Sequence, residues 1–500
     1  MSSEAFDCDV LVVGLGPVGA AVAALLARRG IKVMAIDRDT EIYPLPRAVH
    51  FDHEIMRLLQ HLDVAEAVSR HAQEAPDYEF RNSAGQLLAR LQPAPSTPSG
   101  WASGYMFHQP GLERALRDQL AAGGNADVRL GWRFESLAQD PLGVTATVSG
   151  PEGPAQIRAR YVIGCDGASS AVRGMIGGGL FDYAFDEPWL VVDAVVEAGC
   201  RLPEVNLQLC VPERPTTCVL GGPGRHRWEF MLLPGETPED MLADGRVEAL
   251  IAPWDCGPVR IDRKAVYRFH GLVANRWRSG RVLLAGDAAH QTPPFAGQGM
   301  CAGLRDAFNL AWKLDAVISG GADESLLDSY QTEREPHVRA FIELAIGMGR
   351  VVCTQDRDAA AARDAEMLSR MQSGAPALPP LVPPPFTVGC LLPGSPAAGT
   401  VFPQPCVGED HQRRRMDDVL GDAPCLITRS AVSTVATDVQ LLPIESERLA
   451  PFRGALEAWL DEHGVEAVLV RPDRCVFGAG EPHELLSAWR RALSPIPRAA

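Results

Sequence analysis

Apolar residues in the first 37 positions fall into short runs that are separated by glycines and closed by polar residues. The longest run, residues 10–27, is interrupted by Gly14, Gly16 and Gly19, which argues against a membrane-spanning helix. A buried strand, a tight turn and an apolar helix account for this pattern, and a second short strand follows and ends at Asp37. This order of elements predicts the start of an α/β domain.

The three glycines have the spacing of a dinucleotide-binding turn, G-x-G-x-x-G. In such a turn Gly14 makes the sharp bend, Gly16 lets the backbone approach a pyrophosphate, and Gly19 lets the helix pack on the strand. Asp37 follows Gly19 by 18 residues, close to the spacing at which an acidic side chain meets an adenosine ribose. We therefore predict dinucleotide binding. The alternative is a glycine-rich packing contact between a helix and a strand.

A second glycine-rich region begins with the short apolar run at residues 282–285, which predicts a buried strand ending at Gly286. Asp287 follows at the strand end, where a carboxylate can accept hydrogen bonds from sugar or ribityl hydroxyls. Two prolines then remove N–H donors, and two glycines let a ligand approach the backbone. Apolar residues recur at helical spacing from Leu304 to Leu314, so a helix with its N-terminal amides towards the loop is expected. This loop is predicted to lie beside a planar ligand.

The remaining segments predict further layers. Residues 128–159 alternate as antiparallel strands do, and strand-like runs between Pro and Gly at 179–275 predict a mainly antiparallel sheet. Residues 76–104 are rich in Pro, Ser and Gly and predict an excursion from the nucleotide fold. Helices are expected through about residue 350, followed by a stiff proline-rich linker at 378–386. Strands and a helix start again at about residue 395.

Four short sequences between residues 286 and 314, GDAAH, PP, GQG and RDAFNLAWKL, resemble the second flavin-binding motif of the single-component FAD-dependent aromatic hydroxylases. This is the family of p-hydroxybenzoate hydroxylase and phenol hydroxylase, and YVIGCDGASSAVR at residues 161–173 resembles its DG motif. The strongest resemblance is to the 3-(3-hydroxyphenyl)propionate hydroxylase subgroup. That subgroup usually has Asn after the GQG, where this chain has Met300 and Cys301. A glycine-rich loop before a core helix in another α/β protein is the alternative.

The resemblance implies an α/β fold with a Rossmann-like FAD domain, an inserted mainly antiparallel substrate sheet and a C-terminal thioredoxin-like domain without its dithiol. The expected divisions are residues 1–75, 105–178 and 276–352 for the FAD-binding domain, 76–104 and 179–275 for the substrate-binding region, 353–394 for a helix and linker, and 395–500 for the C-terminal domain.

The resemblance also implies which residues hold the cofactor. Arg47 would contact the pyrophosphate or the isoalloxazine, and Gln109 a phosphate or the ribityl chain. A solvated arginine and a polar residue at a helix start are the respective alternatives. The DG motif, with Asp166 and Gly167, is associated with both FAD and the nicotinamide donor. The full predicted set is Gly14, Gly16, Pro17, Val18, Gly19, Asp37, Arg38, Arg47, Gln109, Asp166, Gly167, Gly286, Asp287, Pro294, Gly297, Gln298, Gly299, Met300 and Cys301.

The catalytic residues are less well marked by the sequence. We predict His50 as the base that activates a phenol, with His53 as a neighbouring alternative. His290 and Pro293 are expected to wall the flavin face, although His290 could instead cap its loop. A structural role is the alternative for every histidine. The candidates to meet a phenolate or carboxylate in the substrate region are Arg214, His226, Arg227 and Tyr267.

Composition narrows the partners. The chain has 500 residues, a net charge of -16 and a pI near 5.3, which argues against nucleic acid or an anionic membrane as a partner. Glu4, Asp7 and Asp9 stand where a secretory leader carries basic residues, so a cytoplasmic location is expected. The 12 cysteines include no C-x-x-C pair, which argues against a structural zinc site and against a flavin disulfide reductase.

The function that the resemblance implies is hydroxylation of a phenolic aromatic substrate with NADH or NADPH and O2, by way of a C4a-hydroperoxyflavin. A phenolic acid of the 3-(3-hydroxyphenyl)propionate type is the expected substrate, and a polycyclic polyketide is the alternative. An FAD-dependent dehydrogenase or oxidase and a non-catalytic flavin-binding interaction protein are the rival functions. The sequence leaves open the nicotinamide donor and whether the chain forms a homodimer.

Overall fold

Continuous apolar runs form a mainly parallel sheet that is buried on both faces. The computed structural model describes residues 6–379, 382–408, 413–432 and 438–494, so Glu4 and two residues of the predicted proline-rich linker lie outside it. The sheet has the order β17-β18-β11-β1-β2-β8, parallel from β18 onwards, and β10 and β9 extend it from β11 as antiparallel strands. The strands are β1 (Cys8–Val13), β2 (Val33–Asp37), β8 (Ala126–Leu130), β9 (Arg133–Gln139), β10 (Val144–Gly150), β11 (Gly153–Gly164), β17 (Arg278–Ser279) and β18 (Val282–Leu284).

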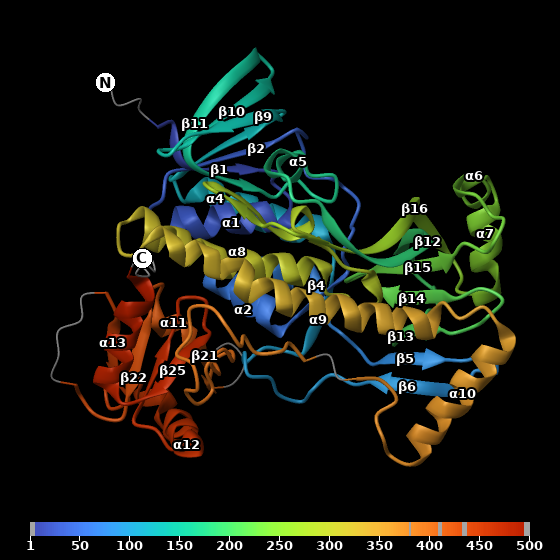
Figure 1. The fold of residues 1–500 in the computed structure, drawn as a ribbon. Coiled ribbons are helices and arrows are strands. Elements are labelled where there is room, and N and C mark those ends of the chain that lie inside the picture. Colours follow the sequence, from blue (N-terminus) through green and yellow to red (C-terminus); the bar gives the residue numbers. More distant parts are fainter. Residues whose placement is uncertain (1–5, 380–381, 409–412, 433–437, 495–500) are drawn as a thin grey trace.

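Helix α1 (Pro17–Arg28) packs between α4 (Gln109–Ala122) and α8 (Gly299–Ile318), as Figure 1 shows. Its alanines allow close approach, because Ala20 to Ala24 are all nearly or fully buried. The two predicted glycine-rich regions are therefore neighbours, although nearly 300 residues separate them. Shorter elements around this layer are β3 (His50–Asp52), α2 (His53–His61), α3 (Ala65–Ser69), β4 (Ala72–Glu74), β7 (Gly104–Phe107), α5 (Ala171–Ile176), η2 (Gly286–Ala288), η3 (Pro294–Ala296) and η4 (Glu324–Leu327).

A second, mainly antiparallel sheet has the order β19-β16-β12-β15-β14-β13-β5-β6. Only β13 and β5 pair in parallel. Residues 78–91 thus join a sheet whose other strands come mostly from 180–274. The elements are β5 (Tyr78–Arg81), β6 (Leu87–Leu91), β12 (Leu180–Val196), β13 (Asn206–Leu209), β14 (Thr216–Leu220), β15 (Arg225–Met231), α6 (Pro238–Leu242), α7 (Arg246–Ile251), η1 (Ala252–Trp254), β16 (Val259–Ala274) and β19 (His290–Gln291).

Two long helices, α9 (Asp328–Val352) and α10 (Arg357–Gln372), run beside this second sheet (Figure 1). The C-terminal unit then forms a four-stranded sheet of order β23-β22-β24-β25, in which only β22 and β23 are parallel. Its elements are β20 (Cys406–Val407), β21 (Arg414–Arg415), α11 (Asp417–Leu420), β22 (Cys425–Thr428), β23 (Gln440–Pro443), η6 (Ala450–Phe452), α12 (Arg453–His463), β24 (Ala467–Val470), β25 (Val476–Gly480) and α13 (Pro482–Leu493).

Buried ion pairs connect the C-terminal unit to the rest of the chain. The Arg57 guanidinium donates to both carboxylate oxygens of Asp417, at 2.7 and 2.8 Å. Arg471 pairs with Glu333 on α9 at 2.8 Å, and all four side chains are nearly or fully buried. Buried charges are tolerated only when they are paired in this way, so the unit has a fixed position.

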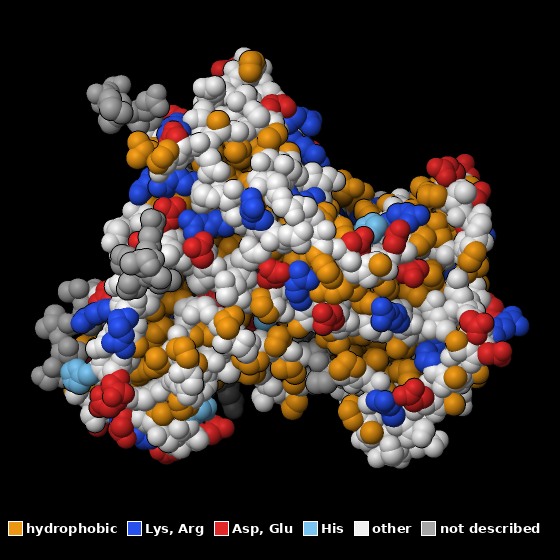
Figure 2. All heavy atoms as spheres, viewed as in Figure 1, with side chains coloured by type: hydrophobic (Ala, Val, Ile, Leu, Met, Phe, Trp, Pro, Cys, Tyr) orange, Lys and Arg blue, Asp and Glu red, His pale blue; other side chains and the backbone are white. Residues whose placement is uncertain are grey.

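No described helix is both long and apolar enough to cross a bilayer. Figure 2 shows Lys and Arg side chains interspersed with Asp and Glu over one face of the molecule.

Candidate active site

A cavity of about 1590 Å³ lies where the parallel sheet, the antiparallel sheet and the C-terminal unit meet. Its wall includes the first glycine turn, the loop at residues 47–50, the loop at 292–300, the inner face of β13 to β15, and residues 473–475 of the C-terminal unit. The space therefore runs without a break from the predicted dinucleotide turn to the antiparallel sheet.

The three glycines of the first turn have different surroundings. Gly14 has φ of +94°, and a Cβ added there would lie 2.5 Å from the Cys165 carbonyl oxygen. A Cβ on Gly19 would lie 1.9 Å from the Gly14 carbonyl oxygen, so this glycine is needed for the helix to pack on the strand. Gly16 lines the cavity, and a Cβ there would meet no atom within 4 Å. The turn thus leaves open space above Gly16, as a bound pyrophosphate requires.

Asp37 stabilises this turn from the end of β2. Its carboxylate accepts hydrogen bonds from Leu15 N at 2.7 Å and from Asp39 N at 2.9 Å. Neither Asp37 nor the exposed Arg38 lines the cavity, whereas Pro17 and Val18 do. A contact of Asp37 or Arg38 with the cofactor stays a prediction.

Gln109 holds the loop that carries Arg47. Its amide oxygen accepts from Arg47 N at 3.0 Å and from Ala48 N at 2.7 Å, and its amide nitrogen donates to Glu113 at 2.7 Å. Both polar groups of Gln109 are therefore engaged within the protein. Gln109 thus positions the loop of Arg47, and because it also lines the cavity, its contact with a phosphate or ribityl chain stays a prediction.

Arg227 on β15 holds the same loop from the opposite side. It donates to Arg47 O at 2.8 Å and to Pro46 O at 2.7 Å, and it pairs with the buried Asp193 at 2.7 Å. The side chain of Arg47 is exposed and has no carboxylate within ion-pair distance among the described residues. The loop is fixed at both sides while its cation remains available to a ligand.

The second glycine-rich loop places most of its predicted residues on the cavity. Asp287, Pro294, Gly297, Gln298, Gly299 and Met300 line it. Asp287 is exposed, and its carboxylate has no hydrogen-bond partner among the described residues. Helix α8 begins at Gly299, so its free N–H groups face this loop.

Three predicted residues of this loop lie behind the cavity wall. Gly286, with φ of +63°, packs against Val18, and Pro293 is buried. Cys301, which stands where the resembling subgroup usually has Asn, is also buried, and its Sγ lies 3.8 Å from Gly297 O. A direct contact of these three residues with the cofactor stays a prediction.

His290 does not line the cavity, and its predicted place at the flavin face stays a prediction. The side chain is buried, and its Nε2 lies 2.6 Å from Asp306 on α8. Arg334 donates to the other oxygen of Asp306 at 2.9 Å, and the Trp277 ring lies against the imidazole with centroids 5.2 Å apart. These buried contacts join the loop to α8, as the alternative of a structural histidine expects.

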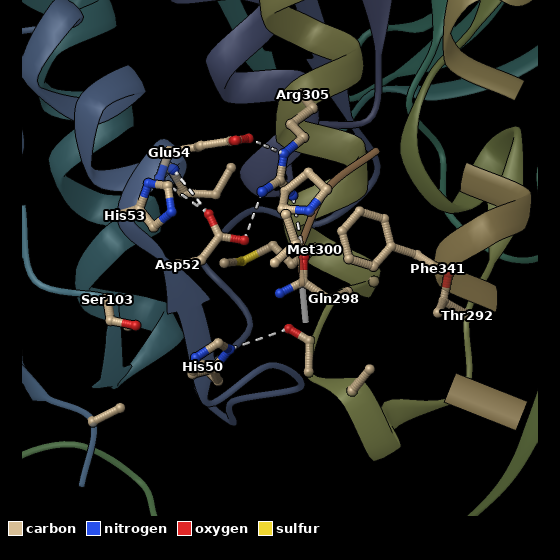
Figure 3. A pocket seen from close by; sticks show the side chains of 18 of the residues that line it. His50, Asp52, His53, Glu54, Ser103, Thr292, Gln298, Met300, Arg305 and Phe341 are labelled. Carbon is tan, nitrogen blue, oxygen red and sulfur yellow. Dashed lines mark hydrogen bonds and ion pairs between the residues drawn. The ribbon is translucent and has the colours of Figure 1, made fainter. Parts of the chain in front are cut away.

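His50 lies on the cavity wall, at the start of β3 (Figure 3). Its Nδ1 lies 3.4 Å from Gly297 O, which accepts the proton of this nitrogen. Burial lowers the pKa of His50, so the imidazole is neutral near neutral pH and its Nε2 has a free lone pair. Nε2 points towards Gly104, where a Cβ would come within 2.7 Å. The role of His50 as a base stays a prediction.

An ion cluster beside His50 was not predicted. Arg305 on α8 pairs with Asp52 at 2.7 Å and with Glu54 at 2.5 Å, and it donates to the Gln298 amide oxygen at 3.1 Å (Figure 3). Asp52 also caps α2 by accepting from the Glu54 and Ile55 amides. The sequence could indicate Asp52 only as a helix cap, and a helix cap does not reveal that Arg305, some 250 residues away, is its partner. The alternative base His53 is bonded through Nδ1 to Ser99 Oγ at 3.0 Å.

The DG motif shapes the loop rather than presenting its carboxylate. Asp166 accepts from Ser170 Oγ and from Val172 N in the first turn of α5, whose N-cap residue is Ser170. Asp166 does not line the cavity, so its contact with the cofactor stays a prediction. Gly167 does line the cavity, with φ of +81°. Arg173 donates to Ala288 O at 3.0 Å and so links this motif to η2.

Of the four candidates in the substrate region, Arg227 alone lines the cavity. Arg214 pairs with Glu236 at 2.6 Å, His226 lies 3.2 Å from Cys218 Sγ in the core, and Tyr267 stacks under Arg263. Alternation along β15 points the even-numbered residues away from the cavity. The polar and apolar side chains that line this part were not predicted: Tyr78, Met106, Asn206, Gln208, Thr217, Val219, Glu229 and Phe295.

A glycine turn on a parallel sheet that opens into a cavity shared with a second sheet defines a nucleotide-cofactor-binding protein of the α/β class. Residues 7–345 match the FAD binding domain family, and residues 432–494 match the HcaD C-terminal domain. The chain belongs to the FAD binding domain family.

Named relatives agree with this assignment. The chain is 36% identical to a probable NADH-specific resorcinol 4-hydroxylase of Rhodococcus jostii (strain RHA1), over 98% of this chain and 96% of the relative. It is 35% identical to a 3-(3-hydroxy-phenyl)propionate/3-hydroxycinnamic acid hydroxylase of Mycolicibacterium smegmatis (strain ATCC 700084 / mc(2)155), over 94% and 90% of the two chains.

Solved structures resemble the whole chain. Aklavinone-11 hydroxylase in a ternary complex with FAD and aklavinone has a TM-score of 0.78 at 26% identity, covering 98% of this chain and 99% of the other. The flavin-dependent monooxygenase PieE, with FAD and substrate, has a TM-score of 0.81 at 25% identity, covering 98% and 100%. The predicted family of FAD-dependent aromatic hydroxylases and the predicted FAD cofactor are confirmed.

Proposed function

We propose that this chain hydroxylates a small phenol with O2 and NADH. The observation that carries the proposal is the single cavity that joins Gly16 and Asp287 on the cofactor side to the inner face of the antiparallel sheet. His50 lies between the two sides with a free nitrogen lone pair. The phenols that the relatives' names suggest are resorcinol and 3-(3-hydroxyphenyl)propionate, and a polycyclic aromatic is the alternative.

The residues present fit FAD. The open space at Gly16 and the unpaired cation of Arg47 suit a pyrophosphate, and the free carboxylate of Asp287 suits ribityl hydroxyls. Backbone amides of residues 297–299 at the start of α8 suit an electron-rich edge of the flavin ring. Cys301 in place of Asn leaves these amides unchanged. When bound, FAD supplies the two-electron chemistry that no amino-acid side chain provides.

His50 would take the proton of the phenol. A neutral imidazole whose Nδ1 is bonded to Gly297 O holds its Nε2 as an acceptor in a fixed direction. Loss of the phenol proton raises the electron density of the ring, which is the change that electrophilic hydroxylation needs. The ion cluster of Arg305 holds Asp52 and Gln298 beside it, and so fixes the wall around His50.

We also propose the domain division given above, with a Rossmann-like FAD domain, an inserted substrate region and a thioredoxin-like C-terminal domain. The sheet order β23-β22-β24-β25, with β22 and β23 parallel, supports the last assignment. Without a dithiol this domain would act by packing, since residues 473–475 line the cavity. A homodimer through this domain is part of the same proposal.

The test is anaerobic reduction of the FAD-bound protein by NADH and by NADPH, each with and without resorcinol and 3-(3-hydroxyphenyl)propionate. We expect NADH to reduce the flavin much faster when a phenol is present, and the aerobic product to contain one additional oxygen atom. Reduction of the flavin by an organic substrate without a nicotinamide would replace this proposal with a dehydrogenase or oxidase. A flavin that neither nicotinamide reduces would favour a non-catalytic protein.

A further inference from the structure

Glu229 is a buried carboxyl group that faces the cavity from β15. The residue is 7% exposed, and it lines the cavity beside Thr217 of the neighbouring strand. Arg227 Nη1 lies 3.7 Å from Glu229 Oε1, within ion-pair distance, and no described residue forms a hydrogen bond with the carboxyl group. A buried carboxyl group with one long ion pair and no hydrogen bond has unused acceptor sites, so it is expected to have a ligand as a further partner.

Two hydroxyl groups near Glu229 have already used their donor hydrogens. The Tyr78 hydroxyl and the Thr217 hydroxyl both donate to the Gln208 amide oxygen, each at 2.9 Å. The Gln208 amide nitrogen donates to Thr216 O at 3.2 Å. What these hydroxyls still offer is lone pairs, so this part of the wall accepts hydrogen bonds from a ligand.

Positive charge on the cavity wall is also committed. Seven arginines and no lysine line the cavity, and six of the arginines lie within ion-pair distance of a carboxylate. These are Arg57 with Asp417, Arg90 with Glu79, Arg227 with Asp193, Arg305 with Asp52, Arg334 with Asp306, and Arg474 with Asp417. The seventh is Arg47, which the proposed function assigns to the FAD pyrophosphate. A ligand carboxylate would thus lack a free cation.

We propose that Glu229 is a specificity-determining residue, which accepts a hydrogen bond from a second hydroxyl of the phenolic substrate and disfavours substrates that carry a carboxylate at that place. This inference rests on the proposed function and narrows it towards benzenediols. Burial raises the pKa of Glu229, and the Arg227 guanidinium opposes this rise. A carboxylate ligand at this place would be surrounded by acceptors and by a second acidic group.

The experiment compares ligand binding to the FAD-bound wild type and to Glu229→Gln, which keeps the shape of the side chain and removes its charge. The control is Glu187→Gln, on β12 of the same sheet. Burial raises the pKa of Glu187 too, but the residue does not line this cavity. Dissociation constants of resorcinol, 3-methoxyphenol and 3-(3-hydroxyphenyl)propionate are measured from the change in flavin absorbance without NADH. Phenol-dependent NADH oxidation is measured alongside.

We expect the wild type to bind resorcinol at least about ten-fold more tightly than 3-methoxyphenol, which lacks the second donor, and than the phenolic acid. Glu229→Gln should lose about ten-fold in resorcinol affinity and gain affinity for the acid, while Glu187→Gln stays as wild type. The inference is overturned if the wild type prefers the acid or 3-methoxyphenol, or if the two variants behave alike. Those results would still leave phenol-dependent NADH oxidation intact, whereas failure of the proposed function would appear as its absence in the wild type. The ligand comparison in the wild type stands even if Glu229→Gln fails to fold.

Discussion

Replacing Gly16 by Val separates cofactor binding from folding. The backbone at Gly16 is extended, with φ of −68°, and a Cβ there meets no atom within 4 Å. The only expected loss of stability is that of a poorer residue at the N-terminal cap of α1, roughly 0.5–1 kcal/mol. Gly19→Ala is the contrasting change, because its Cβ would lie 1.9 Å from the Gly14 carbonyl oxygen. Overpacking of this kind costs about 1–3 kcal/mol.

The effect on FAD follows from the space that the valine would fill. The pyrophosphate would lose its contact with the backbone amides of the turn, and each hydrogen bond to a charged group contributes about 1.5–3 kcal/mol. Because about 1.4 kcal/mol is a ten-fold change, the dissociation constant of FAD should rise roughly 10- to 150-fold for each bond lost. The apoprotein should remain folded.

The assay strips FAD from each protein and follows its rebinding by quenching of flavin fluorescence, with the Tm of the apoprotein measured by circular dichroism. Gly454→Val is the matched control, because this glycine of α12 also has no atom within 4 Å of an added Cβ and lies in the C-terminal unit. Wild-type FAD affinity in Gly16→Val would refute the reasoning. So would a fall in apoprotein Tm as large as that of Gly19→Ala.

Three further outcomes are expected. Asp417→Asn should lower the free energy of unfolding by about 3–5 kcal/mol in urea titration, because it leaves the buried Arg57 cation without its partner; a change below about 1 kcal/mol would contradict this. Burial opposes ionisation of Glu333, yet Arg471 and Lys313 lower its pKa to about 2. The contribution of Glu333 to stability should be complete above the pKa of the unfolded chain, near 4.3, and should be lost as the pH falls towards 2. Urea unfolding between pH 2 and 5 would measure this loss. Equal stability across this range would count against the ion pair. His50→Gln should lower the rate of phenol hydroxylation about 100-fold while FAD affinity is retained, and rapid product formation by this variant would exclude His50 as the base.

Local patterns determined the parts of the site that depend on neighbouring residues in the sequence. The roles of Gly14, Gly16 and Gly19 were predicted because a strand, a turn and a helix meet within a dozen residues, and the backbone geometry of that turn admits few residue types. The loop from Asp287 to Gly299 was predicted for the same reason. The strands of the antiparallel sheet also follow strand-like runs of residues that are visible in the sequence.

Side-chain direction could not be predicted from those patterns. Gln109 and His290 stand at positions that suggested the cofactor, yet Gln109 holds the Arg47 loop and His290 is buried against Asp306. Each is a polar residue beside a cavity, and only packing decides whether its polar atoms face the ligand or the protein. The two-residue segment His290–Gln291 also forms β19 at the edge of the antiparallel sheet. Two residues are too few to show a periodicity that would predict this strand.

The sequence by itself determined the class of fold, the cofactor family and the two glycine-rich loops, because these depend on local backbone geometry and on short motifs. The tertiary structure alone decided the substrate side. Arg305 meets Asp52 across about 250 residues, and Glu229 faces the same cavity as Gly16 from another sheet. Such contacts depend on how sheets pack and on which face of a strand is turned inward, and neither is fixed by the residues next to them in the sequence.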